Sequence, residues 1–198
     1  MSEHYYSKRP AVESDRAVVH AKLRGFELSF VTDAGVFSKN DIDFGSRLLI
    51  ETMRIPESAE VLDVGCGYGP IGICAAKLAF RGKVTMLDIN ERAVELASEN
   101  ARRNEAGNVR VMQSDRLEAV KDETFDVILT NPPIRAGKSV VHDIFAGAAE
   151  RLVAGGSLWV VIQKKQGAPS AFEKLQTLFS RVDEVTKDKG YRIFEAKK

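Results

Sequence analysis

Three glycines at alternate positions, Gly65, Gly67 and Gly69, restrict the fold of this chain more than any other feature of its sequence. They belong to the segment Asp63–Pro70 (DVGCGYGP), which follows a short apolar run and precedes a stretch with apolar residues at helical spacing. Glycine has no Cβ, so such a loop allows the backbone to approach a bulky ligand closely. A glycine loop between a strand and a helix is typical of doubly wound α/β sheets, in which ligands bind at the carboxyl ends of the strands.

The rest of the chain supports this fold class. Strand-like and helical segments alternate with short connections, which predicts a mostly parallel sheet with helices on both faces. We expect strands at 60–64, 83–88, 109–113, 125–130 and 157–162, helices at 70–80, 91–104, 140–153 and 170–180, and a closing antiparallel hairpin at 182–186 and 191–196. The pair Gly155-Gly156 is expected to end the helix at 140–153.

The N-terminal part has a different pattern. Residues 1–16 are polar and are interpreted as an arm. Apolar and polar side chains then alternate on both sides of Arg24-Gly25, which predicts a β-hairpin. Asp41 or Asp43 is a candidate N-cap for a helix that continues to about Met53. We therefore expect residues 1–55 to add an arm, a hairpin and a helix to a core at 56–198, within one compact domain.

Composition excludes several classes of protein. The 198 residues carry 29 Lys and Arg against 28 Asp and Glu, and 44% of them are hydrophobic, so the chain is not intrinsically disordered. A net charge of +1 also argues against a wholly basic coat protein for nucleic acid, although it allows a local basic patch. The two cysteines, Cys66 and Cys74, predict neither a zinc site nor a disulfide. No apolar run approaches a membrane span or a signal peptide, so a cytoplasmic protein is expected, with a monomer as the default.

Acidic residues stand at the expected carboxyl ends of three strands. Asp63 opens the glycine loop and could accept hydrogen bonds from an ammonium group or from the amides of the loop itself. Asp88 follows 25 residues later, about where a carboxylate binds ribose in a nucleoside site, although it could also simply cap the next helix. Asp115 could accept the amine of an adenine or be an ordinary loop residue. A dinucleotide fingerprint would need glycine where Pro70 stands, so an adenosine-bearing ligand is expected and an oxidoreductase is the weakest interpretation.

A second motif, Asn131-Pro132-Pro133-Ile134, directly follows the strand expected at 125–130. Two prolines cannot extend a central strand, so they fix a rigid turn at its carboxyl end. The Asn131 side-chain oxygen and the Pro132 carbonyl would then present two acceptors to a planar NH2 group. Alone, Asn-Pro is a common turn former. Beside the glycine loop, we interpret it as a site for an amine.

Together these motifs resemble the class I S-adenosylmethionine-dependent methyltransferases, in particular the family of the small-subunit (16S) rRNA guanine-N2 methyltransferase C. The D-x-G-x-G-x-G segment is typical of the superfamily, and N-P-P is typical of members that methylate amino groups. Larger members carry a second, degenerate domain, for which 198 residues leave no room. The similar segments are Gly35–Leu49 (GVFSKNDIDFGSRLL), Asp63–Pro70, Asp88, Asn131–Lys138 (NPPIRAGK) and Trp159–Pro169 (WVVIQKKQGAP).

The resemblance implies a Rossmann-like domain with a seven-stranded sheet, and a role for each matching residue. The glycine loop would hold the methionine end of S-adenosylmethionine, and Asp88 would bind the ribose. Asn131 and Pro132 would bind the target amine, with Pro133 and Ile134 beside the base. The residues implied to bind the cofactor are Phe37, Ser38, Asp43, Asp63, Gly65, Cys66, Gly67, Gly69, Asp88, Ile89, Asp115, Arg116 and Asn131.

The implied substrate is an exocyclic amine of RNA, guanine N2 of small-subunit rRNA, and the reaction needs no metal. The expected partner is rRNA, either free or in the small ribosomal subunit. In the arm, Tyr5 and Tyr6 either stack on a base or tether the arm to the body. Basic residues expected at the same rim, as candidates for phosphate contact, are Arg135, Lys138, Lys164 and Lys165.

Two alternatives stay open at this point. A protein glutamine N-methyltransferase would use the same two acceptors on a side-chain amide. A non-catalytic, RNA-binding ribosome assembly factor would retain the fold without turnover, although the intact Asp63, Gly67 and Asn131 speak against such decay.

Overall fold

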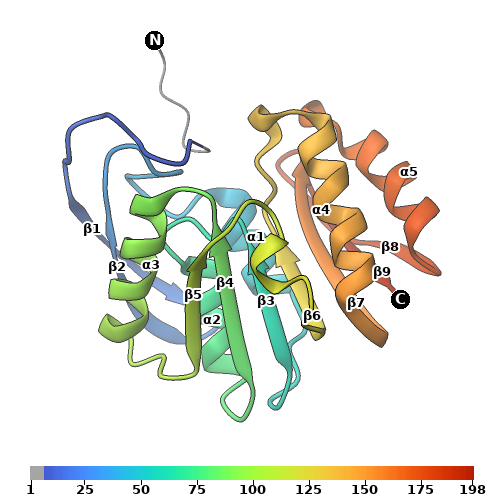
Figure 1. Ribbon diagram of the computed structural model, residues 1–198, viewed down its shortest axis with the longest axis horizontal. Helices are drawn as coiled ribbons and strands as arrows, with labels where there is room; N and C mark the ends of the chain where they lie inside the picture. Colours follow the sequence, from blue (N-terminus) through green and yellow to red (C-terminus); the bar gives the residue numbers. More distant parts are fainter. Residues whose placement is uncertain (1–6) are drawn as a thin grey trace.

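The structure, a computed structural model, describes residues 7–198, so Tyr5 and Tyr6 lie outside the described residues. Seven strands form one sheet in the order β5-β4-β3-β6-β7-β9-β8, which confirms the predicted fold class (Figure 1). The parallel strands are β3 (Glu60–Val64), β4 (Lys83–Asp88), β5 (Val109–Gln113), β6 (Phe125–Thr130) and β7 (Leu152–Gln163). The antiparallel hairpin of β8 (Arg181–Asp188) and β9 (Tyr191–Lys197) completes one edge.

Helices cover both faces of the sheet (Figure 1). One face packs against α1 (Phe44–Thr52), α2 (Pro70–Leu78) and α3 (Glu91–Arg103), with the separate hairpin of β1 (Ala17–Leu23) and β2 (Phe26–Thr32) beside α3. The other face packs against α4 (Lys138–Arg151) and α5 (Ala168–Leu178). Three short 3₁₀ helices connect the elements: η1 (Glu118–Val120), η2 (Ile134–Ala136) and η3 (Lys164–Gln166).

The order of the strands places a crevice beside β3. From β3 the chain adds β4 and β5 on one side, and then crosses to place β6 on the other side. The loops that follow β3 and β6 therefore leave the sheet in opposite directions. Open α/β sheets bind their ligands at such a switch point, outside the carboxyl ends of the strands.

Turn chemistry explains both hairpins. Arg24 and Gly25 have φ angles of 52° and 85°, and Lys189 and Gly190 have φ angles of 45° and 82°. Positive φ at both central residues is the signature of the type I′ turn, whose twist matches that of the flanking strands. Of the two candidate caps for α1, Asp43 is the one used, because its Oδ1 accepts a hydrogen bond from Ser46 N at 3.1 Å.

The end expected for the helix at 140–153 is wrong. Helix α4 begins at Lys138 and ends at Arg151, and the pair Gly155-Gly156 lies inside β7. Between its pairings with Phe125 and Val127, β7 carries a bulge, in which Gly155 has a φ of 78°. A Cβ on Gly156 would lie 2.9 Å from the carbonyl oxygen of Asp126. The glycines therefore allow a bulge rather than a helix end. Helices α2 and α5 also end two residues earlier than expected.

Residues 8–16, here called the strap, pack against α3 and the segment that follows β2. The buried carboxylate of Asp33 accepts hydrogen bonds from Ser14 Oγ at 2.7 Å and from Asp15 N at 2.6 Å. Arg92 of α3 donates to the carbonyl oxygens of Val12 at 2.9 Å and Ala34 at 2.6 Å. Burial alone would raise the pKa of Asp33, but these hydrogen bonds and the Arg92 charge lower it.

Candidate functional site

A cavity of about 680 Å³ lies at the carboxyl ends of β3, β4, β5 and β6. All the residues predicted to bind the cofactor line it except Asp63 and Gly69, and Pro132, Pro133 and Ile134 line it as well. Segments that are far apart in the sequence thus form one wall, from Phe37 and Ser38 after β2 to Asn131 after β6. The other lining residues include Val36, Ser46, Tyr68, Asn90, Ser114, Arg135, Gln166 and Tyr191.

Asp88 fixes the glycine loop from the end of β4. Its Oδ2 accepts a hydrogen bond from Gly67 N at 2.8 Å, and its Oδ1 accepts one from Asn90 N at 2.9 Å. Gly67 has a φ of 57° and open space where a Cβ would stand, so its backbone faces the cavity without obstruction. Burial raises the pKa of Asp88 to about 6, although the N–H groups of Asn90 and Gly67 lower it again in part.

Asp63 lies beneath the loop rather than on the cavity wall. Its side chain is fully buried, and within residues 7–198 neither carboxylate oxygen accepts a hydrogen bond of good geometry. Burial raises its pKa to about 7; the nearby N–H of Gly72 lowers it in part, and the charge of Asp88 raises it further. An uncompensated carboxylate below a ligand-binding loop favours a ligand with a positive charge.

Gly69 shapes the join between loop and helix instead of lining the cavity. It has a φ of 106° and stands directly before α2. A Cβ at this position would lie 2.9 Å from the side chains of both Ile73 and Met86. The third glycine is therefore required by backbone conformation and by packing.

The wall beyond Asp88 consists of Ile89, Asp115 and Arg116. Arg116 has a φ of 50°, and its guanidinium pairs with Asp115 at 3.0 Å and with Asp143 of α4 at 2.9 Å. Sequence reasoning missed Asn90, which caps α3 and donates from Nδ2 to the carbonyl oxygen of Gly35 at 2.8 Å. An Asn directly before a helix indicates a cap, but nothing in the pattern indicates its second partner.

Asn131 follows β6, whose last residue, Thr130, donates from Oγ1 to Val64 O at 2.9 Å. The Asn131 side chain donates from Nδ2 to Asp43 Oδ2 at 3.2 Å and to Ser46 Oγ at 3.0 Å. Asp43 was expected at the cavity, whereas Ser46 was missed because it lies inside the predicted helix. The first turn of α1 therefore contacts the turn that follows β6.

Exposed cations lie beside the cavity. Arg135 lines it, and Lys138, Lys164 and Lys165 are exposed in the segments that follow β6 and β7. The sequence did not indicate Lys189, whose Nζ lies 4.7 Å from the centre of the Phe44 ring. The turn that carries Lys189 also accepts a hydrogen bond from Lys164 N at Gly190 O, at 2.7 Å.

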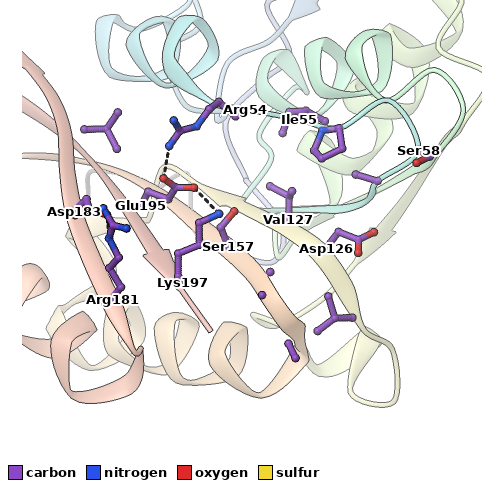
Figure 2. A pocket seen from close by; sticks show the side chains of 17 residues that line it. Arg54, Ile55, Ser58, Asp126, Val127, Ser157, Arg181, Asp183, Glu195 and Lys197 are labelled. Carbon is purple, nitrogen blue, oxygen red and sulfur yellow. Dashed lines mark hydrogen bonds and ion pairs between the residues drawn. The ribbon is translucent and has the colours of Figure 1, made fainter.

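A wider groove of about 990 Å³ lies at the opposite end of the strands (Figure 2). Its central group is Glu195, which is buried and pairs with Arg54 and with Lys197, the latter at 2.9 Å. Arg181 pairs with Asp183 at 2.7 Å. The cations are thus matched by carboxylates, and none of the predicted site residues lines this groove.

Within residues 7–198, no group of three or more His, Cys, Asp or Glu side chains is arranged to hold a metal ion, and none of the helices has the length and apolar character of a membrane span. Cys66 and Cys74 are both buried free thiols.

The profile of the methyltransferase small domain family matches residues 27–195. The uncharacterized protein YbxB of Bacillus subtilis is 56% identical over the full length of both chains. Ribosomal RNA small subunit methyltransferase C of Vibrio cholerae is 32% identical over 88% of this chain. Ribosomal RNA large subunit methyltransferase G of Streptomyces avermitilis is 31% identical over 83% of it.

A solved structure is similar over nearly the whole fold. The 16S rRNA N2 methyltransferase of Thermus thermophilus, in complex with AdoMet and guanosine, superposes with a TM-score of 0.83 and 26% identity over 96% of this chain. The chain spans about half the length of the rRNA methyltransferases that it matches: 51% in Vibrio cholerae, 44% in Streptomyces avermitilis and 52% in Thermus thermophilus.

Proposed function

Because the chain belongs to the methyltransferase small domain family, we propose that it transfers a methyl group from S-adenosylmethionine to an exocyclic amine of rRNA, with guanine N2 of the small subunit as the target. The observation that carries the proposal is the position of Asn131 and Pro132, on the wall of the cavity that Asp88 and the glycine loop also line. The small-subunit relative supports the choice of subunit, and the guanosine-bound structure supports the choice of guanine.

The residues around the loop fit the cofactor expected from the sequence. The unpartnered carboxylate of Asp63 favours positive charge above the loop, and S-adenosylmethionine carries an ammonium and a sulfonium group. Asp88 would accept hydrogen bonds from the ribose hydroxyls, and Ile89 and Asp115 would lie at the adenine. Phe37, half exposed at the cavity, would cover the ligand. When bound, the cofactor supplies a methyl group: the target nitrogen gains an N–C bond as the S–C bond breaks, S-adenosylhomocysteine is left, and one amine proton is released to solvent.

The turn after β6 would position the amine. The Asn131 side-chain oxygen and the Pro132 carbonyl would accept hydrogen bonds from the two N–H groups of the amine. These bonds would direct the nitrogen lone pair toward the methyl group. This lone pair is delocalised into the guanine ring, so alignment at about 3–3.5 Å contributes more than a strong base. Pro133 and Ile134 would contact the base, which has to leave its stack at a cost of a few kcal/mol.

The cations beside the cavity would contact the RNA backbone. Arg135 and Lys138 follow the amine-binding turn directly, and Lys164 and Lys165 follow the neighbouring strand. Phosphate contacts from these side chains would orient the RNA without selecting its sequence. Selection would then depend on the cavity itself.

The experiment that tests the proposal uses cell extract from a strain that lacks the protein. Purified protein and methyl-labelled S-adenosylmethionine are added, and the label is tested for sensitivity to nuclease and to protease. We expect nuclease-sensitive label that digests to N2-methylguanosine. Protease-sensitive label would instead identify a glutamine methyltransferase, and cofactor binding without any label would favour an assembly factor.

A matched variant connects the activity to the site. Asn131→Ala removes the proposed acceptor but leaves the glycine loop and Asp88 in place. We expect transfer to be lost while cofactor affinity, measured by calorimetry, stays within about threefold, because this acceptor acts on the amine. Full activity in this variant would remove Asn131 from the mechanism.

A further inference from the structure

The amide group of Asn131 has two hydrogens, and both have acceptors on α1. Nδ2 donates to Asp43 Oδ2 at 3.2 Å and to Ser46 Oγ at 3.0 Å. A side-chain amide offers two N–H donors and one carbonyl oxygen. Its donors are therefore saturated, whereas within residues 7–198 its Oδ1 accepts no hydrogen bond. Asn131 lines the cavity, so this oxygen is the polar atom it has left to offer a ligand.

The alternative orientation of the amide is unfavourable. A carboxylate such as Asp43 is an acceptor only, so turning the amide over would place two oxygens against each other. Asp43 cannot easily turn away, because its other oxygen, Oδ1, accepts a hydrogen bond from Ser46 N at 3.1 Å and so caps α1. One carboxylate thus fixes both the helix end and the amide.

Helix α1 is itself held firmly. Leu49, Ile50 and Met53 are fully buried in the core on the α1 face, and Ser46 is 5% exposed. The first turn of the helix therefore forms a rigid base for the Asn131 side chain. Precise placement of a reacting group depends on neighbours of this kind, whose own side chains are locked by packing and hydrogen bonds.

We propose that Asp43 and Ser46 are positioning residues that lock the Asn131 amide with Oδ1 toward the substrate amine. The role of this lock in transfer rests on the proposed function, but the orientation of the amide does not. The segment 35–49 then has a purpose beyond covering the cofactor: it determines which atom of Asn131 faces the cavity.

A single substitution reverses the polarity of the lock. Asn is as good an N-cap as Asp, so Asp43→Asn can retain the hydrogen bond from Ser46 N. Its second atom, however, becomes an NH2 donor that faces the NH2 group of Asn131. We expect kcat to fall about tenfold to 100-fold, because the acceptor is turned away or misplaced, while the cofactor Kd stays within about threefold.

The reciprocal exchange provides the rescue. In Asp43→Asn combined with Asn131→Asp, the new amide donates to the new carboxylate, whose second oxygen again faces the cavity as an acceptor. We expect kcat to recover at least tenfold over Asp43→Asn alone, because one correctly placed acceptor is restored. Asp41→Asn is the matched control, since Asp41 is a carboxylate two residues away that does not contact Asn131, and it should retain wild-type kcat.

A second measurement does not depend on activity. In protein with ¹⁵N-labelled asparagine, the side-chain NH2 signal of Asn131 is assigned by its loss in Asn131→Ala. We expect its hydrogens to exchange slowly with water in the wild type and faster in Ser46→Ala and in Asp43→Asn. A slowly exchanging amide in a protein that methylates no RNA would leave the lock intact and overturn only the proposed function.

Three outcomes would overturn the lock. One is rapid exchange of the Asn131 amide in the wild type. Another is a kcat that does not change in Asp43→Asn, or that is no higher in Asp43→Asn combined with Asn131→Asp than in Asp43→Asn alone. The third is a loss of cofactor affinity as large as the loss of kcat, which would make Asp43 a cofactor-binding residue instead.

Discussion

Two carboxylates lie close to one glycine loop, and both are held where a negative charge is unfavourable. Asp63 is fully buried with no hydrogen bond of good geometry within residues 7–198, and Asp88 stands at the end of the neighbouring strand. Burial raises the pKa of both, to about 7 and about 6. The fold alone would be more stable without this charge at neutral pH. A positively charged ligand above the loop explains why such groups stand there.

The variant Asp63→Asn tests whether the buried charge of Asp63 destabilises the fold. For an acid whose pKa rises from 3.8 when unfolded to about 7 when folded, only the native state binds the proton in between. The contribution of Asp63 to stability therefore falls as pH rises from about 4 to 7 and is constant above. Between pH 5 and pH 8, we expect the free energy of unfolding of Asp63→Asn to gain on the order of 2 kcal/mol over that of the wild type.

Urea denaturation at several pH values measures this difference. Asp122→Asn, which removes an exposed carboxylate, is the control. The same Asp63→Asn variant should bind S-adenosylmethionine more weakly, because the charge beneath the loop is gone. A difference from wild type that does not change with pH would show that Asp63 titrates alike in the folded and unfolded chain.

At the scale of elements, hydrophobic periodicity and turn residues predicted nearly every strand and helix. The loops that carry Asp88 and Asn131 could be placed together, because the carboxyl ends of parallel strands meet at one edge of the sheet. Gly155 misled the prediction, since glycine is common both at helix ends and in bulges, and only the pairing of β7 with β6 decides between them. Ser46 had no local pattern at all, because its partner is 85 residues away.

The strap at 8–16 is another contact that local pattern does not indicate. Glu91 N at the start of α3 donates to Lys8 O at 3.0 Å, and Arg92 holds Val12 as described above. The strap lies directly on Gly35, where a Cβ would stand 2.8 Å from Pro10 and 2.9 Å from Val12. The next residues after Gly35 line the cavity, so the strap supports one of its walls.

Arg92→Ala should therefore act on both strap and site. It removes hydrogen bonds to two carbonyl oxygens and the cation near buried Asp33, a loss of about 1–3 kcal/mol. We expect faster cleavage by trypsin in the strap, which offers cleavable bonds after Lys8 and Arg16, and cofactor binding weakened several-fold. Arg102→Ala, exposed in the last turn of the same helix, is the control. Unchanged proteolysis would show that the strap is held without Arg92.

At the scale of the whole molecule, the near-zero net charge conceals an uneven distribution. The groove at the amino ends of the strands matches its cations with carboxylates, Arg54 and Lys197 with Glu195 (Figure 2). At the carboxyl ends, exposed cations lie beside the cavity, as described above for Lys164 and Lys165. The exposed cations beside the cavity are therefore a candidate electrostatic footprint for a polyanion, at the end of the molecule that carries the proposed site.

The salt dependence of RNA binding tests whether these cations contact RNA. The slope of log K against log salt is negative, and each phosphate that a cation neutralises on a single strand makes it steeper by about 0.7. Lys164→Ala combined with Lys165→Ala should thus make this slope less steep by about 1.4 for a single-stranded fragment of small-subunit rRNA. The control is Lys83→Ala combined with Lys121→Ala. These two lysines are also exposed, but they lie at the opposite end of the sheet, where Lys83 begins β4 and Lys121 precedes β6, so their removal should leave the slope unchanged. Equal effects of the two pairs would mean that RNA responds only to total charge, and the footprint would then lose its connection to the site.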